Sequence, residues 1–170
     1  MQQAYGPPRD ALTLGPGVGV NASFVGRTFT LPRPYEVEAP ILRAFAHAVG
    51  ATHPACFDRD AARGLGYRDI VAAPTFAVVI AQAAEALYLA DPASGIDFTR
   101  VVHAEERFIH THPLVAGDRV NATIEVVAIT VRSALTQITT SARLTVLGSA
   151  ADAGPCVTVH STLAVRAARS

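Results

Sequence analysis

The chain has 170 residues, of which 50% are hydrophobic, so it can bury one sizeable core. Its formal net charge at pH 7 is zero, because 14 basic residues, all of them arginine, balance 14 acidic ones. This balance argues against a nucleic-acid partner or a charged membrane surface as the main partner.

Cysteine usage and hydropathy indicate the cellular environment. Cys56 and Cys156 fit no metal-binding spacing, so we expect buried, reduced thiols rather than a disulfide. The longest apolar stretch, residues 70–89, is interrupted by Gln82 and Glu85, and the N-terminus lacks the pattern of a signal peptide. We expect a soluble cytoplasmic protein with no membrane partner.

In the first half of the chain, a tail without periodicity is followed by a short strand and two short helices. Residues 1–22 contain clustered Gly and Pro without periodicity, which predicts a flexible N-terminal tail. Residues 24–31 have strand-type composition and are followed by two prolines. Apolar residues at every fourth position then predict an amphipathic helix over residues 40–50, and a short helix is expected near residues 58–64.

The second half combines one apolar helix with four strands. Residues 74–89 are apolar on nearly all sides, as in a helix buried in a core. Alternating Val, Ile and Thr then predict strands over residues 99–110, 118–133, 134–147 and 156–166. A curved antiparallel sheet around the apolar helix accommodates this order. We therefore predict one α+β domain over residues 23–170.

Four short sequence words carry a family resemblance. They are Gly-Ala-Thr-His-Pro-Ala-Cys-Phe at 50–57, Ala-Ala-Arg-Gly-Leu-Gly-Tyr at 61–67, Val-Ala-Ala-Pro-Thr-Phe at 71–76, and Pro-Leu-Val-Ala-Gly-Asp at 113–118. In this order they resemble the N-terminal MaoC-like dehydratase family, and in particular the non-catalytic A- and C-type subunits of actinobacterial (3R)-hydroxyacyl-acyl-carrier-protein dehydratases. The resemblance implies a hot-dog fold with a long central helix.

The resemblance also implies a chemistry that this chain lacks in part. Catalytic members carry Gly-Asp-x-Asn-Pro-x-His after the first helix, and the aspartate and histidine together remove water from a 3-hydroxyacyl thioester. Here Gly50 and Pro54 match, but Ala51 stands for the aspartate, His53 for the asparagine and Cys56 for the histidine. We therefore expect no catalytic residue at the motif positions.

Two residues of this loop have alternative interpretations. His53 is a weak candidate for a substitute base, although a loop histidine is more often a packed or capping side chain. Cys56 is a thiol that would need a neighbouring base to act as a nucleophile, and it is interpreted first as a small buried residue. Asp58 and Asp60 are expected to cap the short helix that follows.

The start of the central helix is the expected binding region. Its free amides and helix dipole suit the oxygen of a thioester, whereas an ordinary N-terminal cap by Thr75 is the favoured alternative. The expected substrate-binding residues are Pro74, Thr75, Phe76, Val79 and Ile80. Packing of these residues in the core remains the alternative.

The remaining histidines suggest no cofactor or metal site. His103, Glu105 and Arg107 alternate along one strand, so we predict that they share a solvated face or the rim of a dimer. That set is not metal-like without a third convergent ligand. His110 and His112 flank Thr111 on one strand face before a turn, and metal binding there is the disfavoured alternative.

Three functions follow from the sequence. The first is a subunit of an (R)-3-hydroxyacyl-thioester dehydratase that pairs with a short catalytic MaoC-type subunit and contributes to the acyl channel. The second is a homodimer that binds acyl-CoA or acyl carrier protein without turnover. The third is a hot-dog enzyme with relocated catalytic groups.

Overall fold

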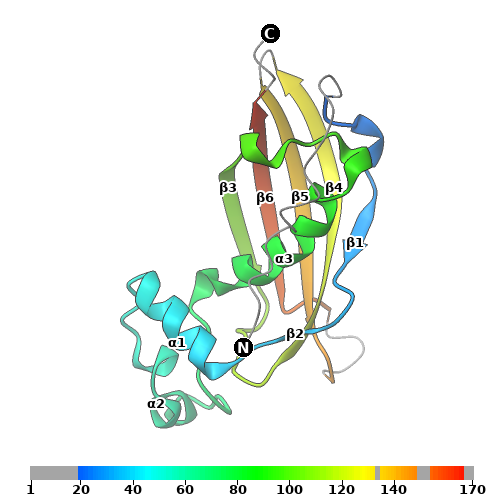
Figure 1. Ribbon diagram of the computed structural model, residues 1–170. Helices are drawn as coiled ribbons and strands as arrows, with labels where there is room; N and C mark the ends of the chain where they lie inside the picture. Colours follow the sequence, from blue (N-terminus) through cyan, green and yellow to red (C-terminus); the bar gives the residue numbers. More distant parts are fainter. Residues whose placement is uncertain (1–18, 133–134, 149–153, 167–170) are drawn as a thin grey trace.

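The computed structural model describes residues 19–132, 135–148 and 154–166 (Figure 1). Most of the segment predicted to be a flexible tail lies outside these residues. The end of that segment is attached to the fold, because the N–H of Asn21 donates to the Ser94 carbonyl at 2.8 Å and its side-chain amide donates to the Ala93 carbonyl at 3.0 Å.

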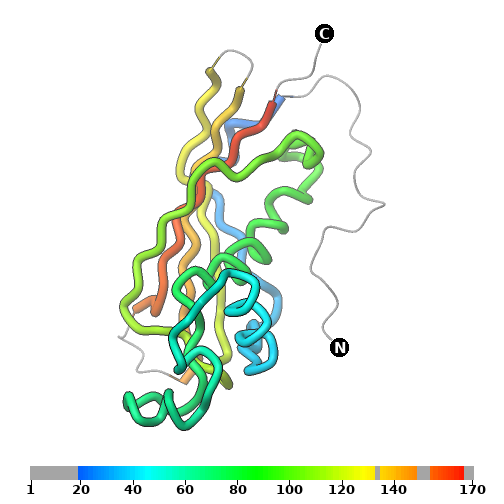
Figure 2. The backbone as a smooth tube through the Cα atoms, turned by 90° about the vertical axis from the view of Figure 1, so that its left-hand side faces the viewer, coloured from blue at the N-terminus to red at the C-terminus, as the bar shows by residue number. Residues whose placement is uncertain are grey.

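One antiparallel sheet forms the frame of the molecule and curves around the long helix α3 (Figures 1 and 2). The order across the sheet is β1-β4-β5-β6-β3, and the short β2 also pairs with β4. The strands are β1 (Thr28–Thr30), β2 (Tyr35–Glu36), β3 (Val101–His110), β4 (Arg119–Arg132), β5 (Leu135–Val146) and β6 (Val157–Arg166). This arrangement is the predicted α+β hot-dog fold.

Helix α3 (Ala77–Leu89) follows a 3₁₀ turn over Pro74–Phe76, and the two together span the helix predicted over residues 74–89. The helix lies on one side of the sheet (Figure 2). Its alanines, including Ala81 and Ala84, are almost fully buried, because their small side chains let the sheet approach the helix closely. At its far end Tyr88 packs on Phe24 with ring centroids 5.5 Å apart.

Two shorter helices, α1 (Ala39–Ala48) and α2 (Arg59–Gly64), lie beyond the start of α3 (Figure 1). Phe45 of α1 packs edge-on against Phe76, with ring centroids 5.3 Å apart. The Asp58 carboxylate accepts the N–H of Ala61 at 2.7 Å, which confirms the predicted cap of α2.

The first strand differs from the prediction over residues 24–31. Residues 22–24 form a 3₁₀ turn, Gly26 has a φ of +84°, and backbone hydrogen bonds to β4 begin only at Gly26 and flank the short β1. The side chain of Phe24 is completely buried. Its aromatic character therefore reflects a place in the core rather than a place in the strand.

The face predicted for His103, Glu105 and Arg107 is wrong, because a β-bulge interrupts β3. His103 is opposite the buried Leu163, whereas Glu105 is opposite Thr162 and Ala104 has no partner in β6. The extra residue turns His103 toward α3 and leaves Glu105 and Arg107 on the opposite face.

The structure bears on two expectations about the cysteines and membranes. Cys56 and Cys156 are both buried and unpaired, as predicted. Across the described ranges, every helix is too short or too polar to cross a bilayer.

Candidate functional site

The loop after α1 carries Ala51 and Cys56, the two positions that the family resemblance aligns with the acid–base pair of catalytic members. Gly50 turns the chain with a φ of +67°, a conformation that favours glycine, and the N–H of Ala51 donates to the Ala46 carbonyl at 2.9 Å. Cys56 is 6% exposed, and burial raises the pKa of its thiol. A methyl group and a protonated thiol therefore occupy the two positions.

His53 has a local structural contact in this loop. Its Nδ1 accepts the N–H of Ala55 at 3.2 Å and so caps the 3₁₀ turn over Pro54–Cys56. An accepting Nδ1 leaves the hydrogen of the neutral ring on Nε2. His53 is exposed at the surface, and this contact is the capping interaction expected of a loop histidine.

A pocket of about 290 Å³ opens at the start of α3, between the segment that leads into the helix and the connection from β3 to β4. Its wall is mostly apolar, with four polar side chains; the lining residues are Tyr67, Val71, Ala72, Ala73, Pro74, Ala77, His110, Thr111, His112, Pro113 and Leu114. No side chain caps either the 3₁₀ turn or α3, so the prediction that Thr75 caps this helix is wrong. No side-chain oxygen of the described residues therefore caps the start of this helix.

His110 connects the end of β3 to the start of the helix. Its Nε2 lies 2.9 Å from the Pro74 carbonyl, which can only accept, so Nε2 carries the hydrogen. In the neutral ring Nδ1 is then an acceptor at the pocket wall.

The residues expected to bind substrate are distributed over different environments. Pro74 lines the pocket, and Thr75 is exposed beside it. Phe76 and Ile80 are completely buried in the core, and Val79 is half-buried against it. The pocket wall comes instead from small residues around Pro74 and from the histidines at the end of β3.

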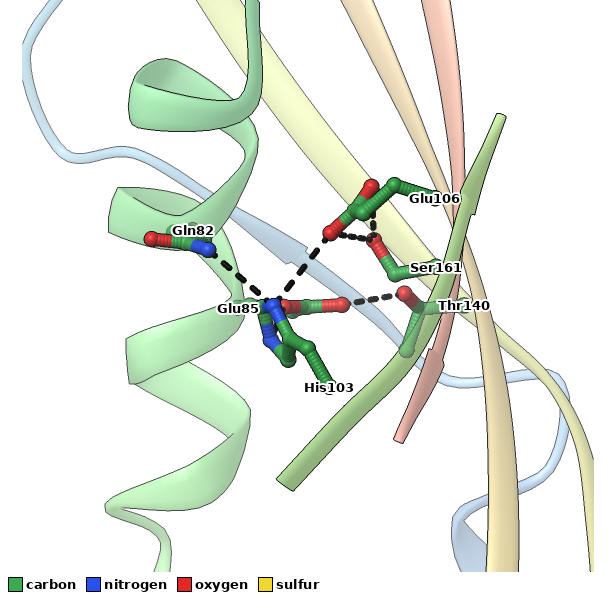
Figure 3. A network of polar contacts seen from close by, with 6 residues as sticks. All are labelled: Gln82, Glu85, His103, Glu106, Thr140 and Ser161. Carbon is green, nitrogen blue, oxygen red and sulfur yellow. Dashed lines mark hydrogen bonds and ion pairs between the residues drawn. The ribbon is translucent and has the colours of Figure 1, made fainter. Parts of the chain in front are cut away.

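A second polar group lies between the middle of α3 and the edge strand β3 (Figure 3). Glu85 is only 1% exposed, and the hydroxyl of Thr140 donates to its Oε1. Its Oε2 lies 3.5 Å from Nε2 of His103, an ion-pair distance, and has no hydrogen-bond partner among the described residues.

The other side of the His103 ring meets Glu106 and Gln82. Nδ1 of His103 is 3.4 Å from Oε1 of Glu106 and 3.1 Å from the side-chain nitrogen of Gln82. The hydroxyl of Ser161 donates to both oxygens of Glu106 at 3.1 Å. Glu85, His103 and Glu106 are referred to below as the His103 cluster.

The contacts of the His103 cluster shift two pKa values. The Glu85 carboxylate raises the pKa of His103 above its usual value, burial opposes this effect, and Glu106 adds to it. Burial raises the pKa of Glu106, while the Ser161 hydroxyl and His103 lower it. Among the described residues, no group of three or more His, Cys, Asp or Glu side chains is placed to hold a metal ion.

Comparison with known proteins identifies the family. Residues 23–150 match the sequence family described as the FAS1-like dehydratase domain region. The chain belongs to this dehydratase-region family. A UPF0336 protein of Leifsonia xyli is 41% identical over 151 residues, covering 88% of this chain and 97% of that protein. A UPF0336 protein of Clavibacter michiganensis is 42% identical over 147 residues, covering 86% and 96%.

Solved structures place the chain among MaoC-like dehydratases. A protein described as a MaoC-like dehydratase superimposes with a TM-score of 0.71 at 26% identity, covering 86% of this chain and 43% of that protein. A chain of the truncated HadBC complex, a 3R-hydroxyacyl-ACP dehydratase from Mycobacterium tuberculosis, superimposes with a TM-score of 0.71 at 26% identity. The match covers 83% of this chain and 96% of the HadBC chain. This MaoC-like chain therefore has the hot-dog fold of its family from end to end of the matched region.

Two functional candidates were not assigned by the sequence. His110 was considered only as a metal ligand, and its contact with Pro74 joins positions that are 36 residues apart. Glu85 interrupts an apolar helix, and a single carboxylate at such a position is a signal that sequence reasoning can use, because buried charges are rare unless they are paired. No sequence pattern points to His103 as its partner.

Proposed function

We propose that this chain is a component of an (R)-3-hydroxyacyl-thioester dehydratase that has lost the catalytic Asp/His pair and forms part of the acyl channel beside a catalytic subunit. One observation carries the proposal. A pocket remains at the uncapped start of the central helix, while Ala51 and Cys56 stand at the acid–base positions.

The chemistry of the reaction supports a division of labour. Loss of water from a 3-hydroxyacyl thioester requires a base for the C2 proton and an acid for the departing hydroxyl group. Neither Ala51 nor the buried thiol of Cys56 can exchange a proton in this way near neutral pH. The helix start can still favour negative charge on a polarised thioester oxygen through its dipole, while the N–H groups of Phe76 and Ala77 donate to the carbonyls of Ala73 and Thr75.

The edge of the sheet supports an association with a second subunit. β3 is the last strand in the sheet order, and within the described residues no strand pairs with the outer backbone edge of its ten residues. Val102 and Ile109 on this strand are 56% and 44% exposed. Pairing with the edge strand of another hot-dog subunit would cover both the backbone and these side chains.

The proposed ligand is an acyl thioester carried by CoA or acyl carrier protein. The pocket lining is mostly apolar and includes the polar side chains of His110, Thr111, His112 and Tyr67. Such a composition suits an acyl group attached to an amide-containing arm, because the apolar wall buries the chain and the few polar groups orient the arm.

Co-expression with a short MaoC-type subunit that carries the intact motif tests the proposal. We expect the two chains to co-purify and to hydrate a 2-enoyl-CoA at least about tenfold faster than the catalytic subunit alone. Thr111→Phe, which fills the pocket from an exposed position, should reduce this gain, whereas Thr130→Phe on the exposed outer face of β4 should not. A rate equal to that of the partner alone would exclude the proposed role.

The third sequence-based function is supported by one observation. His103 beside Glu85 is a histidine–carboxylate pair outside the motif, as relocated catalytic groups would require. Under this alternative the chain alone hydrates or hydrolyses an acyl-CoA, and His103→Asn abolishes that activity. A pure chain that binds an acyl-CoA as a homodimer without turnover would instead support the binding-protein function.

A further inference from the structure

The His103 cluster has more acceptors than donors. Glu85 and Glu106 face a single imidazole, and Oε2 of Glu85 is buried without a hydrogen-bond donor. With both carboxylates ionised, the cluster carries a net charge of −1 when His103 is protonated and −2 when His103 is neutral. A buried carboxylate oxygen without a donor is costly, so further positive charge would stabilise the cluster.

The elements packed around the cluster supply no further charge. Helix α3 adds the amide of Gln82, β5 adds the hydroxyl of Thr140 and β6 adds the hydroxyl of Ser161, all of them neutral. Within residues 19–132, 135–148 and 154–166, no arginine forms an ion pair with Glu85 or Glu106.

Regular alternation along β3 keeps the neighbouring Arg107 away from Glu106. Glu106 is opposite the buried Ser161, whereas Arg107 is opposite His160 on the other face of the sheet. Successive side chains of a strand point to opposite faces, so Arg107 cannot turn toward Glu106 without breaking the pairing with β6. Any neutralising cation must therefore come from outside this sheet.

The open side of the cluster is the free edge of β3. The Glu106 and His103 side chains are 19% and 31% exposed, whereas Glu85 lies beneath them at 2%. A strand added to this edge places its own helix-facing side chains beside Glu106, because paired residues of neighbouring strands point to the same face.

Pairing of two identical copies would bring two such clusters together. If two β3 strands pair antiparallel over at least eight of their ten residues, the two clusters lie within about 15 Å of each other, with a rise of about 3.4 Å per residue and strands about 4.8 Å apart. The Debye length in physiological salt is about 8 Å, and partly buried charges are screened less than exposed ones. In a pair of identical copies the two negatively charged clusters therefore repel each other. A partner with a cation beside Glu106 would instead attract the cluster.

We propose that the His103 cluster makes the β3 edge select a non-identical hot-dog subunit, one whose edge strand presents a lysine or arginine to Glu106 on the helix-facing side. This inference rests on the proposed function, since it specifies the partner of the same assembly. It assigns the cluster to the choice of partner rather than to catalysis.

The charge of the cluster makes this choice depend on pH. Protonation of His103 reduces the net charge from −2 to −1 and so weakens the repulsion between identical copies. The raised pKa of His103 places part of this change near neutral pH. Self-association should therefore be strongest at low pH and should weaken as the pH rises through that pKa.

A pair of neighbouring variants tests the inference by sedimentation. Glu106→Gln removes a charge from the cluster, and Glu105→Gln makes the same change in net charge on the opposite face of the same strand. At pH 8 we expect Glu106→Gln to tighten self-association by about tenfold or more and to weaken the complex with a catalytic subunit, while Glu105→Gln changes either by less than about threefold. Wild-type self-association should weaken between pH 6 and pH 8, and His103→Asn should remove this dependence.

The failure of this inference can be separated from failure of the proposed function. Ala104→Pro blocks the free edge at a bulge residue that has no partner in β6, a position where proline is tolerated. If Ala104→Pro leaves the complex with the catalytic subunit intact, the β3 edge is not the interface and the proposed assembly fails. If Ala104→Pro abolishes the complex but Glu106→Gln and Glu105→Gln behave alike, only the selection by the His103 cluster is overturned.

Discussion

Substitution of Phe76 tests whether this side chain belongs to the hydrophobic core or lines the proposed acyl channel. Phe76 was expected to bind substrate, yet its side chain is completely buried between α1 and the sheet. Its ring packs edge-on against Phe45 at 5.3 Å and against Tyr35 at 6.4 Å between centroids. We therefore expect Phe76→Ala to leave a cavity in the main core rather than to widen a channel.

The magnitude follows from this burial. Removing a fully buried phenylalanine side chain costs about 3–5 kcal/mol of the free energy of unfolding, and loss of the two ring contacts places this site in the upper part of that range. In a domain of this size the change corresponds to a fall in Tm of roughly 6–20 °C. Phe98→Ala is the matched control, because Phe98 is 40% exposed and its removal should cost less than about 2 kcal/mol, clearly less than the removal of Phe76.

Urea denaturation and calorimetry of both variants give the free energy and the Tm. Binding of an acyl-CoA to the folded proteins, measured by isothermal titration, gives the second readout. A Phe76→Ala protein that loses less than about 1 kcal/mol but binds the acyl-CoA much more weakly would refute the assignment of Phe76 to the core.

Three further predictions concern buried polar groups. Thr140→Val removes the donor to Oε1 of the buried Glu85 and should lower the free energy of unfolding by about 1–3 kcal/mol in urea denaturation. Thr139→Val on the other face of β5 should lower it much less, and equal losses would contradict the role of Thr140. Asp118→Ala should lower the free energy of unfolding by about 2–4 kcal/mol in the same assay, because the buried Asp118 carboxylate accepts the N–H of Val115 at 2.7 Å and pairs with Arg68. A loss below about 0.5 kcal/mol would refute the stabilising role of Asp118 in this turn. The free energy of unfolding should fall as the pH rises, since the folded state raises the pKa of His103 above its usual 6.5; this stability is fully present below pH 6.5 and is lost as the pH passes the folded-state pKa. The raised pKa of Glu106 acts in the same direction from about pH 4.5 upward, so His103→Asn should flatten the upper part of the profile, and an unchanged profile would remove His103 as its cause.

Local patterns were sufficient for most of the fold. The four long strands and the central helix follow from periods of two and 3.6 residues, which report the burial of one face without knowledge of the partner. Capping is equally local, and Asp58 accepts the N–H of Ala61 only three residues away, as predicted. The strand predicted over residues 24–31 is longer than the observed β1. An aromatic residue such as Phe24 is typical of strands, but here it lies buried in a 3₁₀ turn.

The candidate sites depended on contacts between distant parts of the chain. The pocket forms where residues 67–77 meet residues 110–114, and His110 reaches the Pro74 carbonyl across this gap. Small residues at 72, 73 and 77 leave the space, but their sequence does not reveal which segment lies opposite. Burial therefore separated Phe76 and Ile80, which fill the core, from Pro74, which lines the pocket.

The sequence by itself determined the fold class, because strand and helix periods are properties of the chain read in order. It also places Ala51 and Cys56 where the family resemblance implies an acid–base pair. The tertiary structure alone decided the partner of Glu85. One extra residue at Ala104 reverses the face of His103 and brings it to the buried carboxylate, and simple alternation cannot anticipate such a bulge. A bulge depends on the register between two strands, and that register is set only when β3 and β6 pair.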